Sequence, residues 1–521
     1  MGIKNFYYIF QNKCKEVIDN KYDKHDILII DLNGIFYNSC NMILKDVDFN
    51  EVDNIKLFET ITENIYNIIK QFLPTKKICL VVDGIAGSMK VCEQRQRRFK
   101  NILENKYKNF DINCLSPGTK MMNHITKYID WFLKKKISFD DKLKHYTIYF
   151  MNEKVIGEGE IKIKQFIEKY CTLDDKILIY SSDSDLIILS ILLQHNITIY
   201  RHSSNNECNF INIQKCKQLF LKKLAWKNSV PNRNIVDFII LIFLLGNDYV
   251  NNIPLFYNFD ILFDIIIPIY QKRKEYLHKL VANDKYIIDI KNIISFFKNI
   301  SKLESFFLTK HNIVSCSYFP NELNGITNIS EYKDIYNNKY FNNIDIENII
   351  IDYFKCMQNV LDLYINNSYK WNFFYKYNKV PFLSDFYHNK KIEDSINFFA
   401  IDNDIPFECI FNLFLILPLQ SQNLLPCCLR DINTLRTYFP SKIEIDLEGK
   451  KRLWEGNITL PNININDFKK EYNKKKELFN NFDKQRNNIG KTIIYSYSDN
   501  EYLFESFYGN IEKCKSKCII E

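Results

Sequence analysis

Seven carboxylates stand in sequence contexts that suit metal-dependent chemistry. They follow short apolar runs or lie beside glycines, and the set is Asp31, Asp83, Glu158, Glu160, Asp183, Asp185 and Asp248. Carboxylates brought close together repel one another and raise one another's pKa. Divalent cations that prefer hard oxygen ligands, Mg²⁺ or Mn²⁺, relieve this repulsion. Two such ions about 4 Å apart activate a water and stabilise the leaving oxygen in phosphodiester hydrolysis, so the set predicts a two-ion site for that reaction.

Each acidic motif taken alone is weak. An Asp after a strand is often a helix cap or a turn residue. The segment Gly157-Glu158-Gly159-Glu160 is more specific, because two glycines around a glutamate cost backbone entropy unless a close approach requires them. For each acidic motif alone, a helix cap or a turn remains an alternative role. The combination of the motifs favours a metal site.

A basic helix face follows the second acidic motif. Lys90, Gln94, Arg97 and Arg98 stand at i, i+4, i+7 and i+8, which places them on one side of a helix. These side chains suit a terminal phosphate, which arginine binds through two parallel hydrogen bonds. The alternative is a solvated basic face, the usual reading of such runs. Arg95 fits that alternative better, because it points elsewhere.

The elements that must position these residues alternate along the first half. Residues 26–30, 77–82 and 176–180 are short apolar runs, and 52–73 and 88–107 have helical patterns between them. Continuous apolar runs separated by helices predict buried parallel strands, and therefore an α/β domain. An aspartate of the acidic set follows each of the three runs, at the carboxyl end of the strand, where such sheets bind ligands.

Four segments are predicted along the chain. They are a catalytic domain over 1–255, a mostly helical connection over 256–365, a second region over 366–490, and a loosely attached tail over 491–521. The charged stretch 469–488 has the pattern of a helix that ends near Gly490.

Composition narrows the class of protein. The 521 residues include 46% hydrophobic residues and only 13 glycines, which excludes collagen-like and disordered chains. The net charge of +8 is compatible with a polyanionic partner. The 15 cysteines lack zinc-site spacing and are expected to be reduced thiols. The longest apolar run, 238–245, is too short to span a membrane.

Taken together, the motifs resemble those of the XRN family of 5′→3′ exoribonucleases. In the first half the matching segments, in family order, are Met1 to Phe6, Asp31 to Ile35, Asp83 to Ala86, Gln94 to Phe99, Ser116 to Thr119, Gly157 to Lys162, Asp183 to Leu186 and Leu245 to Asp248. In the second half they are Leu424 to Pro426, Asp446 to Lys451, Trp454 to Gly456, Leu460-Pro461 and Arg486-Asn487. The long additional C-terminal modules of the large cytoplasmic members have no counterpart.

The resemblance implies a fold, an activity and a set of site residues. The fold is a mostly parallel sheet flanked by helices, a PIN or flap-nuclease-like core, with a largely helical second region packed against it. All seven acids fall on the family's metal ligands, and Lys90, Gln94, Arg97 and Arg98 fall on its 5′-phosphate pocket. The implied protein is a monomer with Mg²⁺ or Mn²⁺ as cofactor. It digests 5′-monophosphorylated single-stranded RNA processively to nucleoside monophosphates.

Departures from the family pattern affect base stacking. Tyr37 stands where the family has a base-stacking His, and an aromatic ring is kept. Ile161 replaces a His beside Glu160, and Asn251-Asn252 replaces a Pro-His pair. A tryptophan pair expected near residues 383–385 is missing, and Phe382, Phe386 and Tyr387 are the candidate substitutes. The alternative is that residues 371–387 only pack in the protein core.

Two further hypotheses remain at this point. A flap-endonuclease-like DNA nuclease shares clustered acids on a related core, and a catalytically weak RNA-binding scaffold would keep the fold without the activity. The basic helix and the second region favour the RNA exonuclease, and a binding protein has little reason to keep seven repelling acids. No convincing basic nuclear signal is present, which favours the cytoplasm. The Asn, Ile, Lys and Tyr bias is compatible with an AT-rich genome, a viral one included.

Overall fold

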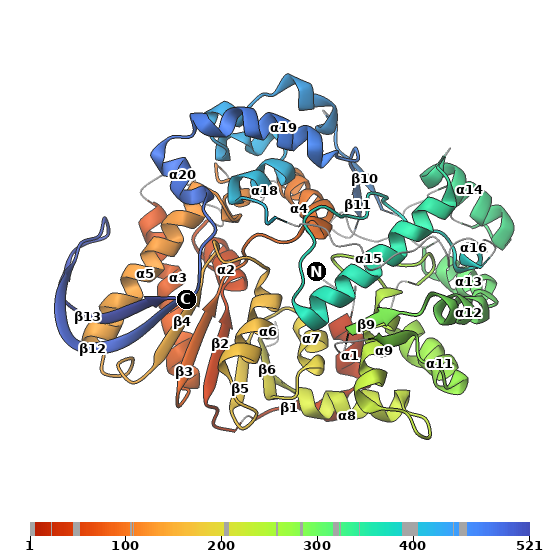
Figure 1. Cartoon of the computed structure of the whole chain (residues 1–521), viewed down its shortest axis with the longest axis horizontal. Helices are drawn as coiled ribbons and strands as arrows, with labels where there is room; N and C mark the ends of the chain where they lie inside the picture. The colour runs from red at the N-terminus through yellow and green to blue at the C-terminus, as the bar shows by residue number, and fades with distance from the viewer. Residues whose placement is uncertain are drawn as a thin grey trace.

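A nine-stranded sheet forms the centre of the chain in the computed structural model (Figure 1). Its order is β1-β7-β6-β5-β2-β3-β4-β12-β13, and the five strands from β6 to β4 are parallel. The strands are β1 (Ile18–Asp19), β2 (Ile27–Asp31), β3 (Lys77–Val81), β4 (Thr147–Met151), β5 (Lys176–Tyr180), β6 (Asn196–His202), β7 (Cys208–Asn212), β12 (Ile493–Phe504) and β13 (Ile511–Ile520). The three predicted strands are confirmed as β2, β3 and β5, so the α/β prediction holds.

The structure describes residues 6–21, 23–44, 53–104, 107, 109–202, 208–256, 259–281, 285–315, 322–323, 325–342, 344–387, 405–440, 442–447 and 456–521. The family-like start before Phe6 lies outside this range. So do most of the 446–451 motif and the Trp454-Glu455 pair.

Helices cover both faces of the sheet, which explains why the parallel strands are continuously apolar. Alternate residues of β2 serve different cores: Ile27 and Ile29 belong to one, Leu28 and Ile30 to the other. The second of these cores includes α2 (Asn33–Leu44), α3 (Asp53–Phe72) and α5 (Lys120–Phe139). The first includes α1 (Phe6–Lys13), α6 (Gly159–Tyr170), α7 (Asp185–Leu192), α8 (Ile213–Leu224) and α9 (Pro231–Phe243).

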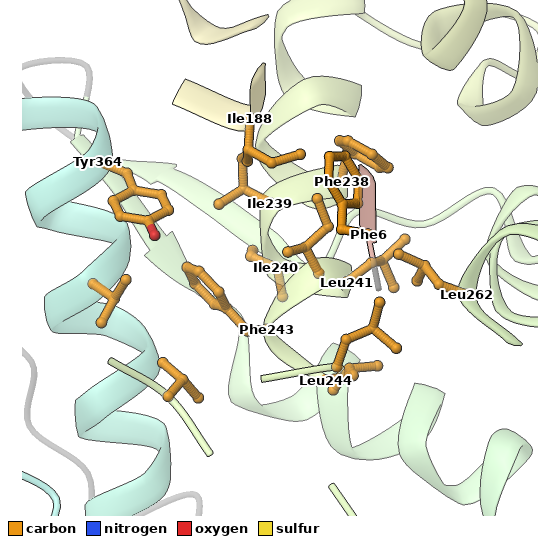
Figure 2. Close-up of a cluster of buried hydrophobic side chains, with 14 of the residues drawn as sticks. Phe6, Ile188, Phe238, Ile239, Ile240, Leu241, Phe243, Leu244, Leu262 and Tyr364 are labelled. Carbon is orange, nitrogen blue, oxygen red and sulfur yellow. The ribbon is translucent and has the colours of Figure 1, made fainter. Parts of the chain in front are cut away.

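The long apolar run of the sequence is the buried helix α9. Figure 2 shows its side chains packed among residues from other elements, Phe6 of α1 and Tyr364 among them. The second half of α9, Phe238 to Phe243, is apolar on every side, and such a segment belongs in a protein core. It also anchors the turn after it, which carries Asp248. No described helix is long and apolar enough to cross a membrane.

The segment 256–365 is mostly helical, as predicted, and also contains a hairpin that was not expected. Its helices are α10 (Phe259–Ile261), a π-helical turn (Leu262–Ile266), α11 (Ile267–Arg273), α12 (Ile290–Ser301), α13 (Glu304–Ser315), α14 (Ile329–Phe341) and α15 (Ile346–Asn366). Strands β8 (His278–Val281) and β9 (Lys285–Ile288) form the hairpin. Apolar residues of this segment pack in the same core as α9, so this core continues across residue 255. The domain boundary at residue 255 therefore stays a prediction.

The second region has its own apolar core, which it shares with the basic helix. The region as a whole contains α16 (Leu383–Phe386), α18 (Cys409–Ile416), α19 (Ile465–Lys475), α20 (Asn481–Asn487) and the hairpin of β10 (Glu444–Asp446) with β11 (Asn457–Thr459). The helix predicted over 469–488 is interrupted by a tight turn at Lys476–Leu478. Val91 and Phe99 of α4 (Val91–Glu104) join this core, and Figure 1 shows α4 against α18.

Two buried arginines fasten the second region to the first half. Arg95 donates to the carbonyls of Tyr438 (2.7 Å) and Pro461 (3.2 Å). Arg486 donates to the carbonyl of Gly118 (2.5 Å) and pairs with Asp483. Arg95 was expected on a solvated face, and this is wrong because the residue is only 3% exposed. The described cysteines are all free thiols, most of them buried.

The prediction of a loosely attached tail is wrong. Residues 493–520 form β12 and β13, and β12 pairs antiparallel with β4 through Tyr495 and Ile148 (Figure 1). Tyr495 is fully buried and its hydroxyl donates to Asp130 Oδ1 (2.6 Å). The hairpin covers the sheet edge that β4 would otherwise leave unpaired.

Replacing Tyr495 by Ala is expected to lower the free energy of unfolding by about 3–5 kcal/mol, the usual cost of emptying a buried aromatic site. Urea unfolding followed by circular dichroism measures this. The matched control is Phe507→Ala in the same hairpin, where the ring is 89% exposed and the change should stay within about 0.5 kcal/mol. Equal small effects at both positions would mean that the hairpin does not stabilise the sheet.

Candidate active site

Three acids lie where neighbouring strands of the sheet end. Asp31 is the last residue of β2, Asp83 follows β3 by two residues, and Asp183 follows β5 by three. The three strands are adjacent in the order β5-β2-β3. Because they are parallel, their carboxyl ends meet at one edge, where such sheets bind ligands.

The other four acids reach the same edge from helix termini. Glu158 is the N-cap residue of α6 and Glu160 lies in its first turn, while Asp185 begins α7. Asp248 follows α9 in a turn.

Backbone amides fix the carboxylates in place. The N–H of Gly159 donates to Asp83 Oδ1 at 2.6 Å, and the N–H of Asp185 to Asp183 Oδ1 at 2.9 Å. A Cβ on Gly159 would lie 3.2 Å from Asp83 Oδ1, which is tighter than most contacts that Cβ atoms make. The close approach predicted for the glycine-rich turn is thus confirmed.

Burial and mutual repulsion raise the pKa of most acids in the set. Burial, then the neighbouring Asp83, raise the pKa of Asp31 to about 7. Burial and Glu158 hold the pKa of Glu160 well above its usual value, and burial and Asp183 do the same for Asp185. Burial also raises the pKa of Glu158 and Asp183. The carboxylates form one electrostatic unit that favours positive charge.

A lysine supplies that positive charge. The Lys90 ammonium lies 2.7 Å from Glu158 Oε1, 3.0 Å from Asp248 Oδ2 and 3.9 Å from Glu160 Oε1. Its side chain is only 3% exposed. The turn Ser88–Lys90 that carries it leads directly into α4, so this residue of the predicted phosphate pocket lies among the acids in the structure, and its phosphate contact stays a prediction.

The donor set suits a hard divalent cation. Its ligands would be carboxylate oxygens, and Asp185 Oδ1 is buried without a hydrogen-bond partner among the described residues. Among the described residues, no group of three or more His, Cys, Asp or Glu side chains is arranged to hold a metal ion as it stands. Side-chain rotations would therefore have to accompany cation binding.

The remaining predicted phosphate ligands follow along α4. Arg97 pairs with Glu93 Oε1 (2.8 Å) and lies 3.8 Å from Asp248 Oδ2. Gln94 is buried. Arg98 is 5% exposed, and its Nε and Nη1 have no hydrogen-bond partner among the described residues. A solvated basic face is thereby excluded, since three of the four side chains are buried.

Tyrosines from distant elements enclose the acids, and the sequence did not reveal them. The Tyr249 hydroxyl donates to Glu158 Oε2, and the Lys90 ammonium lies 4.7 Å from the centre of the Tyr249 ring. The side-chain amide of Asn247 donates to the Tyr364 hydroxyl (3.1 Å). The only sequence feature that could have indicated Tyr249 was its place next to Asp248. No sequence feature indicated that Tyr364, in α15, lies near the acids.

Tyr369 explains why residue 157 is a glycine. Gly157 has φ +106°, and a Cβ there would lie 2.1 Å from the Tyr369 hydroxyl. That hydroxyl is buried and has no hydrogen-bond partner in the described part of the chain. The aromatic block of the second region therefore reaches the glycine-rich turn of the first half.

The predicted stacking residues divide into two groups. Tyr37 in α2 is half-buried and lies near Arg97, and its stacking role stays a prediction. Phe382 and Phe386 are fully buried in the core of α9 and present no face to a base, so they are wrong as substitutes. Tyr387 lies beside Lys298 of α12, 5.8 Å from ring centre to ammonium.

The raised pKa of Asp31 predicts a dependence of stability on pH. The folded carboxyl binds its proton up to about pH 7, whereas the unfolded one loses it near 3.8. The folded state therefore holds more protons across that window, and stability is lost as the pH rises through it. Urea unfolding at pH 5 and 8 in EDTA should show a larger loss for the wild type than for Asp31→Asn; parallel losses would contradict the raised pKa.

Comparisons with known proteins extend the resemblance. The family model described as the XRN 5′-3′ exonuclease N-terminus matches residues 1–109 and 103–203, and the Xrn1 helical domain model matches 329–520. Human 5′-3′ exoribonuclease 1 is 23% identical, with 99% of this chain and 37% of the relative covered. The Saccharomyces cerevisiae 5′-3′ exoribonuclease 1 is 22% identical, with 98% and 46% covered. The chain thus spans less than half the length of these two relatives.

Among solved structures, the catalytic core of Rad2 in complex with a DNA substrate aligns at 16% identity and a TM-score of 0.35. The alignment covers 74% of this chain and 94% of that one.

Proposed function

Because the chain belongs to the XRN family of 5′→3′ exonucleases, we propose that it is a metal-dependent 5′→3′ exoribonuclease. Its substrate would be single-stranded RNA with a 5′ monophosphate, and its products nucleoside monophosphates. The observation that carries this proposal is the pairing of two sites. A cluster of seven acids, of which two are buried and five are partly buried, lies next to a helix whose Arg98 side chain is buried and has two guanidinium nitrogens without a hydrogen-bond partner among the described residues.

In this proposal the acidic cluster is the catalytic centre. Two Mg²⁺ or Mn²⁺ ions, when bound, would supply an activated water and offset charge on the scissile phosphate. Asp31, Asp83 and Asp183 hold fixed positions at strand ends. The tyrosines around the cluster limit the access of bulk water, which strengthens every electrostatic interaction inside.

The helix α4 would bind the 5′ end. A buried guanidinium with two unused donors costs stability unless an anion accepts them. A terminal phosphate does so through two parallel hydrogen bonds to Arg98, with Gln94 beside it one turn earlier. The burial of both residues favours a small 5′ group over a cap or a triphosphate. Tyr37, near Arg97, would stack on the first base in this proposal.

The test uses RNAs that differ only at the 5′ end. With Mg²⁺, the 5′-monophosphorylated RNA should be digested to mononucleotides, and the 5′-hydroxyl RNA should be digested much more slowly. EDTA should stop both reactions. Faster cleavage of flapped DNA would favour the flap-endonuclease alternative, and tight RNA binding without any products would favour the scaffold.

Monomeric state and cytoplasmic location stay predictions from the sequence. A sedimentation experiment with and without RNA tests the first of them.

A further inference from the structure

The position of Lys90 links the two halves of the proposed site. We propose that Lys90 makes cation loading of the acidic cluster conditional on a 5′ phosphate. Without a phosphate its ammonium is the counter-ion of the acids, and with one it moves to the phosphate and leaves the acids to divalent cations. This inference rests on the proposed function and deepens it, because it makes the 5′ phosphate a condition for assembling the catalytic centre.

The first step is that Lys90 is held as an internal counter-ion. Its ammonium contacts Glu158 and Asp248 at 2.7 and 3.0 Å, and Glu160 lies at 3.9 Å. The Tyr249 ring lies 4.7 Å from the same ammonium. A divalent cation that used these carboxylates would meet the ammonium at close range, and like charges at such distances repel strongly in a buried site.

The second step is that the phosphate helix competes for the same charges. Lys90 ends the turn before α4, and Gln94 and Arg98 follow on the same side of that helix. Asp248 Oδ2 lies 3.0 Å from Lys90 and 3.8 Å from Arg97. One carboxylate oxygen therefore draws both basic residues toward the acids. A phosphate dianion beside Arg98 would draw them the other way.

The third step follows from linkage. If a phosphate removes a positive charge from the acids, the affinity of the acids for a divalent cation rises. By reciprocity, the cation must raise the affinity for the phosphate by the same factor. A 5′-hydroxyl end would leave Lys90 among the acids, so discrimination would appear in the catalytic rate as well as in binding.

The experiment measures binding, independently of catalysis. Mn²⁺ is titrated into the full chain by calorimetry, alone, with adenosine 5′-monophosphate, and with adenosine. The direct binding of Mn²⁺ to the nucleotide is subtracted in a titration without protein. We expect the monophosphate to tighten Mn²⁺ binding at least tenfold and Mn²⁺ to tighten monophosphate binding equally, while adenosine has neither effect. Absence of coupling in the wild type would overturn the proposal without any variant.

The variant Lys90→Met keeps the length of the side chain and removes its charge. Mn²⁺ should bind it at least tenfold more tightly than the wild type when no nucleotide is present, and the monophosphate should no longer change that affinity. Lys90→Gln serves as a second variant if the first does not fold. Lys100→Met removes the same charge elsewhere on α4 and should keep the wild-type coupling.

Two outcomes separate this proposal from the function on which it rests. If Lys90→Met keeps the full coupling, the cation and the phosphate interact directly and Lys90 is not the link, although the exoribonuclease proposal survives. If Asp185→Asn binds Mn²⁺ like the wild type under all conditions, the acids are not the cation site and both proposals fail.

Discussion

Asp185→Asn is expected to lower the rate of digestion of 5′-monophosphorylated RNA by roughly a thousandfold, or about 4 kcal/mol of transition-state stabilisation. The amide keeps the size of the carboxylate but removes the charge that a catalytic cation requires. Single-turnover digestion of labelled RNA in saturating Mg²⁺ measures the effect. A variant that digested RNA at the wild-type rate would remove Asp185 from the catalytic centre.

The same substitution should make the protein more stable in EDTA. Asp185 Oδ1 is buried and unpartnered among the described residues, and its neighbours Asp183 and Asp248 disfavour its charge. The loss of activity would then come with a gain of stability, the opposite of what misfolding produces.

Asp175, at the other end of β5, offers a matched control. It is buried, but it pairs with Lys76 at 2.7 Å and accepts from the N–H and hydroxyl of Thr172. These partners bring its pKa to about 2. Asp175→Asn should therefore retain activity and lose stability. The two aspartates flank one strand, and their substitutions are expected to change stability in opposite directions, while only Asp185→Asn lowers activity.

Arg98→Met is expected to remove the preference for a 5′ monophosphate. The value of kcat/KM on 5′-monophosphorylated RNA should fall roughly a hundredfold, equivalent to about 2.7 kcal/mol, because a charged pair of hydrogen bonds to the phosphate is lost. The value on 5′-hydroxyl RNA should hardly change, since that end makes no such contact. Equal losses on both RNAs would argue against a phosphate pocket at α4.

Stability again separates function from folding. The Arg98 guanidinium is buried with two unused donors, so a methionine of similar length should leave the free energy of unfolding unchanged or raise it. Arg95→Met on the same helix should behave in the opposite way, because Arg95 donates to two carbonyls of the second region. Thermal unfolding of the two variants provides the comparison.

The sequence was sufficient where local pattern decides structure. The apolar runs of β2, β3 and β5 required strands buried on both faces, and parallel strands place their following residues at one edge. That argument predicted the convergence of the acids. The close glycine contact at Gly159 followed from the cost of glycine in the Gly157 to Glu160 segment.

Where structure depends on contacts between distant segments, the sequence was insufficient. Lys90 fits the helical spacing of a phosphate site, but nothing local shows that Glu158 and Asp248 lie within reach of its ammonium. Tyr369 reaches Gly157 only because the second region folds back onto the first half. Phe382 and Phe386 were plausible stacking residues by type, and only their packing against the core of α9 excludes them.

The last hairpin also has a consequence for how the protein is made. During translation, β4 leaves the ribosome long before β12, its partner on one side. At 5–20 residues per second, the intervening chain takes tens of seconds to synthesise. Throughout that time the nascent sheet presents an open edge, the kind that recruits other unfolded chains. The edge of β4 is therefore a site of aggregation risk during synthesis, and the risk ends when residues 493–520 emerge and close the edge.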